Sequence, residues 1–129
     1  MSIPIFSFEG RTRRSQWWAI RVFAFVVICM GYAVLAPWWP PLPQPAGLIV
    51  ELLCLPVLLA AMWIDLAAMV RRWHDRDKSG WMSLVMLIPI LGPLWILIEC
   101  GFLDGTPGSN RFGPSPKETP DHAAAMVFN

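Results

Sequence analysis

Long apolar runs and short polar segments alternate along this chain. Between residues 22 and 70 only two side chains, Glu51 and Asp65, are ionised at neutral pH, and residues 79–110 contain only two more. A lipid bilayer selects runs of this kind because a charge near its centre costs several kcal/mol. The pattern predicts an all-α integral membrane protein built as a helical bundle, and it argues against a soluble domain.

Three hydrophobic segments are expected to form this bundle: residues 17–36, 47–70 and 81–103. At the helical rise of 1.5 Å per residue, about 20 residues cover the hydrocarbon core of about 30 Å. The third segment is broken by Pro89 and Pro93, because proline removes a helical hydrogen bond. It is therefore either one kinked span or a re-entrant hairpin, and we expect the kinked span.

The three segments are predicted to form one membrane domain over residues 1–116, followed by a flexible tail over residues 117–129. A proline-rich connector, residues 37–46, joins the first two spans. A cleaved signal peptide is the other interpretation of the first segment. Its length, and Pro37 directly after the only small-residue site, favour a retained anchor.

Basic residues indicate the orientation, because seven of them flank the first two spans on one side. They are Arg11, Arg13, Arg14, Arg71, Arg72, Arg76 and Lys78, whereas the connector has none. The positive-inside rule places these seven in the cytoplasm, together with the N-terminus. Three full spans would place the tail outside, whereas a re-entrant third segment would return it to the cytoplasm. The net charge of only +1 argues against nucleic acid as a partner.

Four motifs in order along the chain point to a known family. They are Phe8-x-Gly10-Arg11-x-x-Arg14-x-x-x-Trp18, Arg72-Trp73-His74-Asp75 with Lys78-Ser79-Gly80-Trp81, Ile88-Pro89-x-x-Gly92, and Gly105-Thr106-Pro107-Gly108-x-Asn110-Arg111-Phe112-Gly113-Pro114-x-Pro116. In these motifs the chain resembles the YhaH-like small bacterial inner-membrane proteins grouped as domain of unknown function 805. The resemblance implies a multi-pass protein of the bacterial inner membrane, and it implies no activity, substrate or cofactor.

Acidic residues within apolar segments are candidates for function, and Glu51 and Asp65 lie in the second segment. Arg21 and Arg72 are expected at a depth similar to that of Asp65, toward the cytoplasmic side. We expect Asp65 to pair with one of these two arginines and so to fix the helices. The alternative is a small proton-coupled transporter or channel that uses Glu51 and Asp65.

His74 and Asp75 allow a second hypothesis, because imidazole and carboxylate together can bind a metal ion or transfer a proton. An interfacial enzyme using these two residues is therefore a weaker alternative. Four cations in the same polar segment oppose cation binding, and the three cysteines lack metal-binding spacing. We expect no catalytic residue, metal or cofactor. The remaining candidate polar residues, Arg11, Arg14, Asn110 and Arg111, lie in the motifs described above.

These observations predict a non-enzymatic, multi-pass protein of the bacterial inner membrane. We expect an accessory or interaction subunit, or a small homo-oligomer. Its environment would be the bilayer, with anionic lipid headgroups at the cytoplasmic face. Its partners would be a larger membrane complex or further copies of the chain.

Overall fold

The computed structural model describes residues 5–35 and 45–117 of the chain. Two long helices are followed by three short ones: α1 (Arg14–Leu35), α2 (Ala46–Asp75), the 3₁₀ helix η1 (Gly80–Leu87), α3 (Leu91–Ile96) and the π-helical segment η2 (Leu97–Phe102). The described ranges contain no β-strand, and the expectation of an all-α fold is confirmed. Most of the proline-rich connector and nearly all of the expected tail lie outside these ranges.

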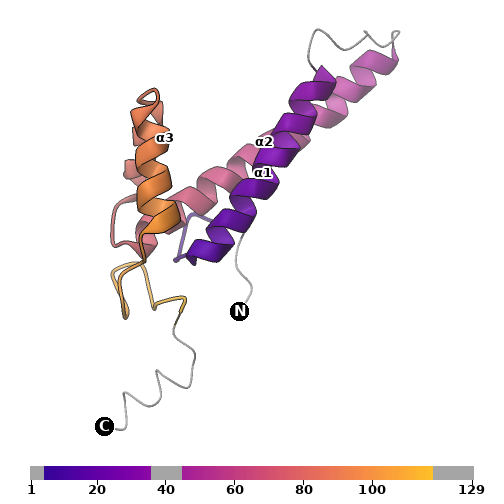
Figure 1. The fold of residues 1–129 in the computed structure, drawn as a ribbon. Coiled ribbons are helices and arrows are strands. Elements are labelled where there is room, and N and C mark those ends of the chain that lie inside the picture. The colour runs from indigo at the N-terminus through magenta and orange to yellow at the C-terminus, as the bar shows by residue number, and fades with distance from the viewer. Residues whose placement is uncertain (1–4, 36–44, 118–129) are drawn as a thin grey trace.

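Helices α1 and α2 form an antiparallel pair (Figure 1). Gly31 permits a close approach of the two helices, because a Cβ at this position would lie 2.4 Å from Cδ2 of Leu58. Both helices are long and apolar enough to cross a membrane, and only 6% of the most apolar window of each is buried. A core helix of a soluble protein would be mostly covered by the rest of the chain. This exposure fits helices that face lipid.

Helix α2 continues to Asp75, five residues beyond the predicted segment, and ends in a turn that reverses the chain. The amide of Lys78 donates to the carbonyl of Trp73 at 2.9 Å, and the amide of Asp77 donates to the carbonyl of His74 at 3.0 Å. Asp77 adopts the left-handed conformation, with φ 57°. This is the Schellman arrangement, in which two otherwise unpaired helix carbonyls find donors. The turn directs η1 back alongside α2.

The third apolar segment is a hairpin, so our expectation of one kinked span was wrong. Gly80, the first residue of η1, lies against Val70 of α2, since a Cβ at Gly80 would be 2.7 Å from Cγ1 of Val70. Near the other end of the segment the carbonyl of Cys100 accepts a 2.8 Å hydrogen bond from Nε of Arg72. Both ends of the segment therefore meet the same end of α2. The returning arm, Leu91–Phe102, spans only about 18 Å at helical rise, too short to cross a bilayer.

Two local features produce the reversal between η1 and α3. Ile90 has φ 66° and ψ −57°, and the amide of Leu91 donates to the carbonyl of Pro89 at 2.7 Å. These values describe a γ-turn, a tight and strained reversal for a β-branched residue. Gly92 then packs on the other arm, where a Cβ would lie 2.0 Å from the carbonyl oxygen of Val85. Only glycine fits this contact.

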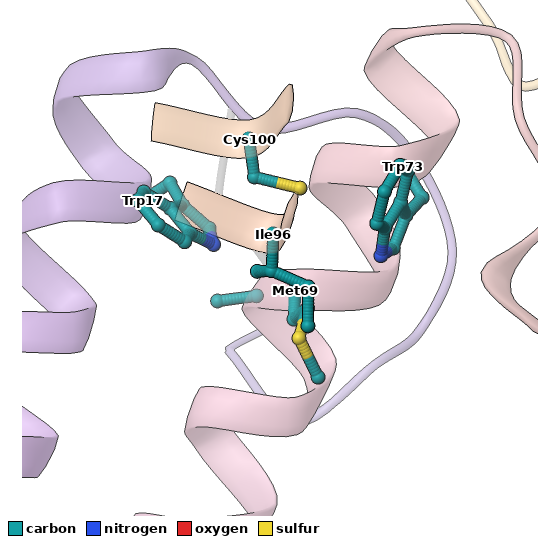
Figure 2. Packing of buried hydrophobic residues seen from close by; sticks show 6 residues of the cluster. Trp17, Met69, Trp73, Ile96 and Cys100 are labelled. Atoms are coloured by element: carbon teal, nitrogen blue, oxygen red, sulfur yellow. The ribbon is translucent and has the colours of Figure 1, made fainter. Parts of the chain in front are cut away.

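The hydrophobic core lies where α1 and α2 meet the end of α3 and η2. It consists of Trp17, Ala68, Met69, Trp73, Ile96 and Cys100 (Figure 2). Beyond this cluster the hairpin leans away from the α1–α2 pair (Figure 1). The fold is therefore held together mainly at one end, the end that carries the polar motifs.

Candidate functional site

Asp75, the last residue of α2, is the centre of a buried polar junction. Its Oδ1 accepts a 2.9 Å hydrogen bond from Nε of Arg11, and its Oδ2 is paired with Nη1 of Arg72. The side chains of Asp75, Arg11 and Arg72 are 4%, 2% and 1% exposed. Charges this deeply buried persist in proteins when they are paired and fully hydrogen-bonded. One carboxylate thus neutralises part of the charge of two arginines.

Arg11 also binds the loop that follows the hairpin. Its Nη2 donates to the carbonyl of Thr106 at 2.6 Å, and its Nη1 donates to those of Gly108 at 2.7 Å and Gly113 at 3.3 Å. A planar guanidinium suits this role because its donors point in fixed directions. The N-terminal arm, residues 5–13 before α1, therefore holds a loop almost one hundred residues away.

The same loop covers the C-terminal end of α2. Thr106 donates to the carbonyl of Asp75 from its amide at 2.8 Å and from its hydroxyl at 3.1 Å. Nδ2 of Asn110 donates to the carbonyl of His74 at 2.8 Å. Gly105 passes directly over the Asp75 carboxylate, since a Cβ there would lie 2.0 Å from Oδ2. The loop thus supplies the donors that the last turn of α2 lacks.

Arg72 fixes the returning arm of the hairpin to this junction. Besides Asp75, it donates to the carbonyls of Cys100 and Leu103. Arg76 and Lys78 hold the same arm from the outside, through ion pairs with Glu99 at 2.7 and 2.9 Å. Residues 104–117 therefore lie on the side of the N-terminal arm, whereas three full spans would place them on the opposite side. The rest of the expected tail lies outside the described residues.

His74 occupies a structural position. Its ring stacks on Phe112, with centroids 3.9 Å apart and planes 6° from parallel, and its Nδ1 lies 3.3 Å from the carbonyl oxygen of Gly10. Arg111 next to Phe112 pairs with Asp77 at 3.2 Å. Within residues 5–35 and 45–117, no group of three or more histidine, cysteine, aspartate or glutamate side chains is arranged to hold a metal ion.

Of the two arginines expected near Asp65, the structure brings Arg21 to it, with Nη1 3.5 Å from Oδ2. Arg72 lies instead in the junction around Asp75. Glu51 is exposed on α2, about 21 Å from Asp65 at helical rise, and the described ranges give it no ion-pair partner. The two acidic residues of the second segment are thus not brought together.

An exposed charge cluster surrounds Asp104 at the rim of the junction. Nζ of Lys117 lies 2.7 Å from its Oδ1, and Nη1 of Arg14 lies 3.7 Å away. The hydrogen bond from Lys117, with the charge of Arg14, holds the pKa of Asp104 below its usual value. Arg14 also donates to the carbonyl of Phe102 at 2.9 Å. The candidate Arg14 therefore ties α1 to the end of the hairpin.

Sequence reasoning missed the contact between Arg11 and Asp75, although it named both residues as candidates. It also missed Glu99 as the partner of Arg76 and Lys78. The signal available was the placement of three polar motifs, each directly at the end of an apolar segment. Segments that end on one side of a bundle bring their polar motifs together. The motif over residues 105–116 joins the other two only if the third segment folds back to that side.

The sequence profile of a family described as protein of unknown function (DUF805) matches residues 5–114. The chain belongs to the DUF805 family. Among curated DUF805-like relatives, inner membrane protein YhaH of Escherichia coli K12 is 36% identical, with 88% of this chain and 89% of the relative covered. Inner membrane protein YhaI of the same organism is 33% identical, with 85% and 86% covered. No solved structure matches the chain. The matched range contains all residues of the junction around Asp75.

Proposed function

We propose that this DUF805 protein is a non-enzymatic protein of the bacterial inner membrane that works by associating with other membrane proteins or with further copies of itself. The observation that carries the proposal is the state of the groups that could perform chemistry. Asp75 is saturated by two arginines, so the carboxylate beside His74 offers no open position, and His74 is stacked on Phe112 and bonded through Nδ1, which leaves it only Nε2. A general acid, a base or a metal ligand needs an open coordination or hydrogen-bonding position.

The basic residues are also committed within the chain, which favours a protein partner over anionic lipid. Eight of the ten lysines and arginines form ion pairs with carboxylates of the same chain: Arg11, Arg14, Arg21, Arg72, Arg76, Lys78, Arg111 and Lys117. A cation already paired contributes less to attraction by an anionic surface. The broad exposed surface that is left is apolar, on the sides of the helices.

The hairpin supports a specific orientation of the chain in the membrane. Because the segment returns to the end where it began, Arg111 and Lys117 join the seven cations near the N-terminal arm and the end of α2. We propose two membrane crossings, by α1 and α2, with the N-terminal arm and residues 104–117 both in the cytoplasm. The positive-inside rule supports this arrangement, since every basic residue except Arg21 then lies at the cytoplasmic face.

A proton-coupled transporter is less well supported. Its two acidic residues lie about 21 Å apart along one helix, and Asp65 is paired with Arg21. Two crossing helices and a short hairpin also enclose little volume for a pathway. An interfacial enzyme based on His74 and Asp75 is disfavoured because Arg11 and Arg72 already occupy the Asp75 carboxylate, so His74 has no open carboxylate beside it to act with.

The proposal is tested by co-expressing two differently tagged copies of the chain and capturing one tag in mild detergent. Mass spectrometry then identifies what is captured, and light scattering gives the mass of the particle. We expect the second copy or a reproducible set of other membrane proteins. A membrane protein of similar size, tagged and expressed at the same level, is the control. Recovery of the monomer alone, at the mass of one chain plus detergent, would contradict the proposal.

A further inference from the structure

A groove of about 570 Å³ lies beside the junction, between the N-terminal arm, α2 and η1. Its lining residues include Phe8, Leu66, His74, Ser83 and Leu84. The arm forms one wall, because the ring of Phe8 packs edge-on against Trp63 of α2, with centroids 5.1 Å apart. The groove follows α2 from Leu66 to His74, which is about 12 Å at helical rise. None of the contacts of the junction described above fills it.

The groove is apolar at one end and polar at the other. Leu66 and Leu84 line the end that lies deeper along the membrane helices, whereas His74 and Ser79 line the end next to the polar loops. Trp81 stands at the polar end with 78% of its surface exposed, as tryptophan does at membrane interfaces. This division matches an amphiphile with its head at the cytoplasmic surface and its chain in the bilayer.

Two polar groups in the groove have no partner in the described part of the chain. Ser83 is 7% exposed, and its buried hydroxyl makes no hydrogen bond. A buried hydroxyl without a partner is unfavourable. The other group is Nε2 of His74. Because the carbonyl of Gly10 can only accept, Nδ1 carries the proton, and Nε2 of the neutral ring is then an acceptor. The site thus offers a donor in its middle and an acceptor at its polar end.

We propose that this groove binds one glycerophospholipid whose headgroup carries a hydrogen-bond donor, as the ammonium group of phosphatidylethanolamine does. The headgroup donates to Nε2 of His74, an ester carbonyl accepts from the hydroxyl of Ser83, and one acyl chain lies against Leu66 and Leu84. Selection for negative charge is not expected, since Lys78 and Arg111 near the polar end are paired with Glu99 and Asp77. Lipid binding here is independent of the association proposed above.

The test uses the purified full chain, stripped of lipid in detergent and then incubated with phosphatidylethanolamine or phosphatidylcholine of the same acyl chains. Native mass spectrometry counts the lipids retained. We expect one lipid per chain and a preference for ethanolamine over choline of about fivefold, the factor that one net hydrogen bond supplies. Equal retention of the two lipids, or retention of neither, would overturn the proposal.

Variants locate the site. Leu84→Trp fills the groove and should lower retention of both lipids about fivefold or more. The acyl chain then loses its apolar contacts in the groove, and their loss weakens binding by about this factor. Leu87→Trp is the matched control, because Leu87 lies on the same helix, is 74% exposed and does not line the groove. The same retention in both tryptophan variants would overturn the proposal.

His74→Phe separates headgroup recognition from folding. Phenylalanine keeps a flat ring to stack on Phe112 but has no acceptor, so the preference for ethanolamine over choline should disappear while choline-lipid retention is unchanged. Ser83→Ala removes a hydroxyl that has no protein partner. It should lower retention of both lipids without lowering the unfolding temperature of the lipid-free protein. A preference that survives in His74→Phe would overturn the assignment of the headgroup.

Discussion

Arg11 and Asp75 form a buried ion pair with 2.9 Å between nitrogen and oxygen, although 64 positions separate them along the chain. The pair joins the N-terminal arm to the end of α2, and the remaining donors of Arg11 bind the loop after the hairpin. Three polar segments that are distant in sequence thus depend on one side chain. Removing Arg11 leaves Asp75 paired with Arg72 alone, whereas removing Asp75 leaves two buried guanidiniums without compensation.

Replacement of Asp75 should be the most damaging change in the junction. Asp75→Ala leaves two buried guanidiniums unpaired, and breaking a buried pair costs about 3–5 kcal/mol. Arg11→Lys should also destabilise, because an ammonium group cannot match the fixed donors that reach Asp75, Thr106 and Gly108. The measurement is the unfolding temperature in detergent. Arg13→Ala is the control, because Arg13 forms no ion pair with Asp75 and its exposed side chain only donates to the carbonyl of Pro116; it should change the unfolding temperature little. An Arg11→Lys protein as stable as wild type would show that the fixed donor directions of the guanidinium do not stabilise the junction.

Because Arg21 pairs with Asp65, substitutions at these two residues should have coupled effects on stability, whereas substitutions at Asp65 and Arg72 should not. Asp65→Ala should lower the yield of folded protein, and Arg21→Ala in the same chain should recover part of the loss, because it removes the uncompensated cation. Arg72→Ala in the same background should add its own loss, since Arg72 pairs with Asp75. Yield and unfolding temperature in detergent measure both effects. Additive losses in the Asp65/Arg21 double variant would show that the 3.5 Å contact contributes nothing.

Two crossings predict a specific labelling pattern in intact cells. A cysteine at Gln44, in the connector between α1 and α2, should react with a membrane-impermeant thiol reagent, whereas a cysteine at Ser79 or Pro116 should not. A background lacking Cys29, Cys54 and Cys100 is needed. Labelling after cell lysis shows that each cysteine is reactive. Reaction of the cysteine at Pro116 in intact cells would mean that the hairpin segment crosses the membrane.

The γ-turn predicts opposite effects of two nearby substitutions. Ile90→Gly should stabilise the hairpin by about 1 kcal/mol, because glycine adopts φ 66° without the strain of a β-branched residue. Gly92→Ala should destabilise it, since the new Cβ would lie 2.0 Å from the carbonyl oxygen of Val85. Thermal unfolding of both variants in the same detergent compares them directly. A stabilising Gly92→Ala would show that the two arms do not pack as described.

Much of the fold was predictable because hydrophobic run length is a physical constraint of the bilayer. The long helices and the depth of Asp65 relative to Arg21 followed from counting residues at helical rise. The form of the third segment did not follow. Pro89 and Pro93 indicate that a helix is interrupted, but a kink and a reversal remove the same hydrogen bonds. The reversal is decided by the backbone conformation of Ile90 and by the contact of Gly92 with Val85, which no local pattern encodes.

The junction was less predictable for a related reason. Four cations near His74 and Asp75 indicated that the carboxylates would be paired, without indicating by which residues. Its expected depth made Arg72 one of two candidate partners of Asp65. The last turn of α2 instead places Arg72 next to Asp75. Arg11 reaches Asp75 only because the arm and the hairpin loop are folded over the same helix end. Contacts of this kind depend on the tertiary arrangement.

The bonds of Arg11 also set an order of events during synthesis. Arg11 leaves the ribosome 97 residues before Gly108, one of the carbonyls that it binds. Both long helices and the whole hairpin are therefore made before the arm can find its complete set of partners. A chain truncated before Gly105 keeps α1 and α2 but leaves Arg11 without its partners at Thr106, Gly108 and Gly113. The complete junction can therefore form only after residues 105–113 have been synthesised, so its closure distinguishes a finished chain from an incomplete one.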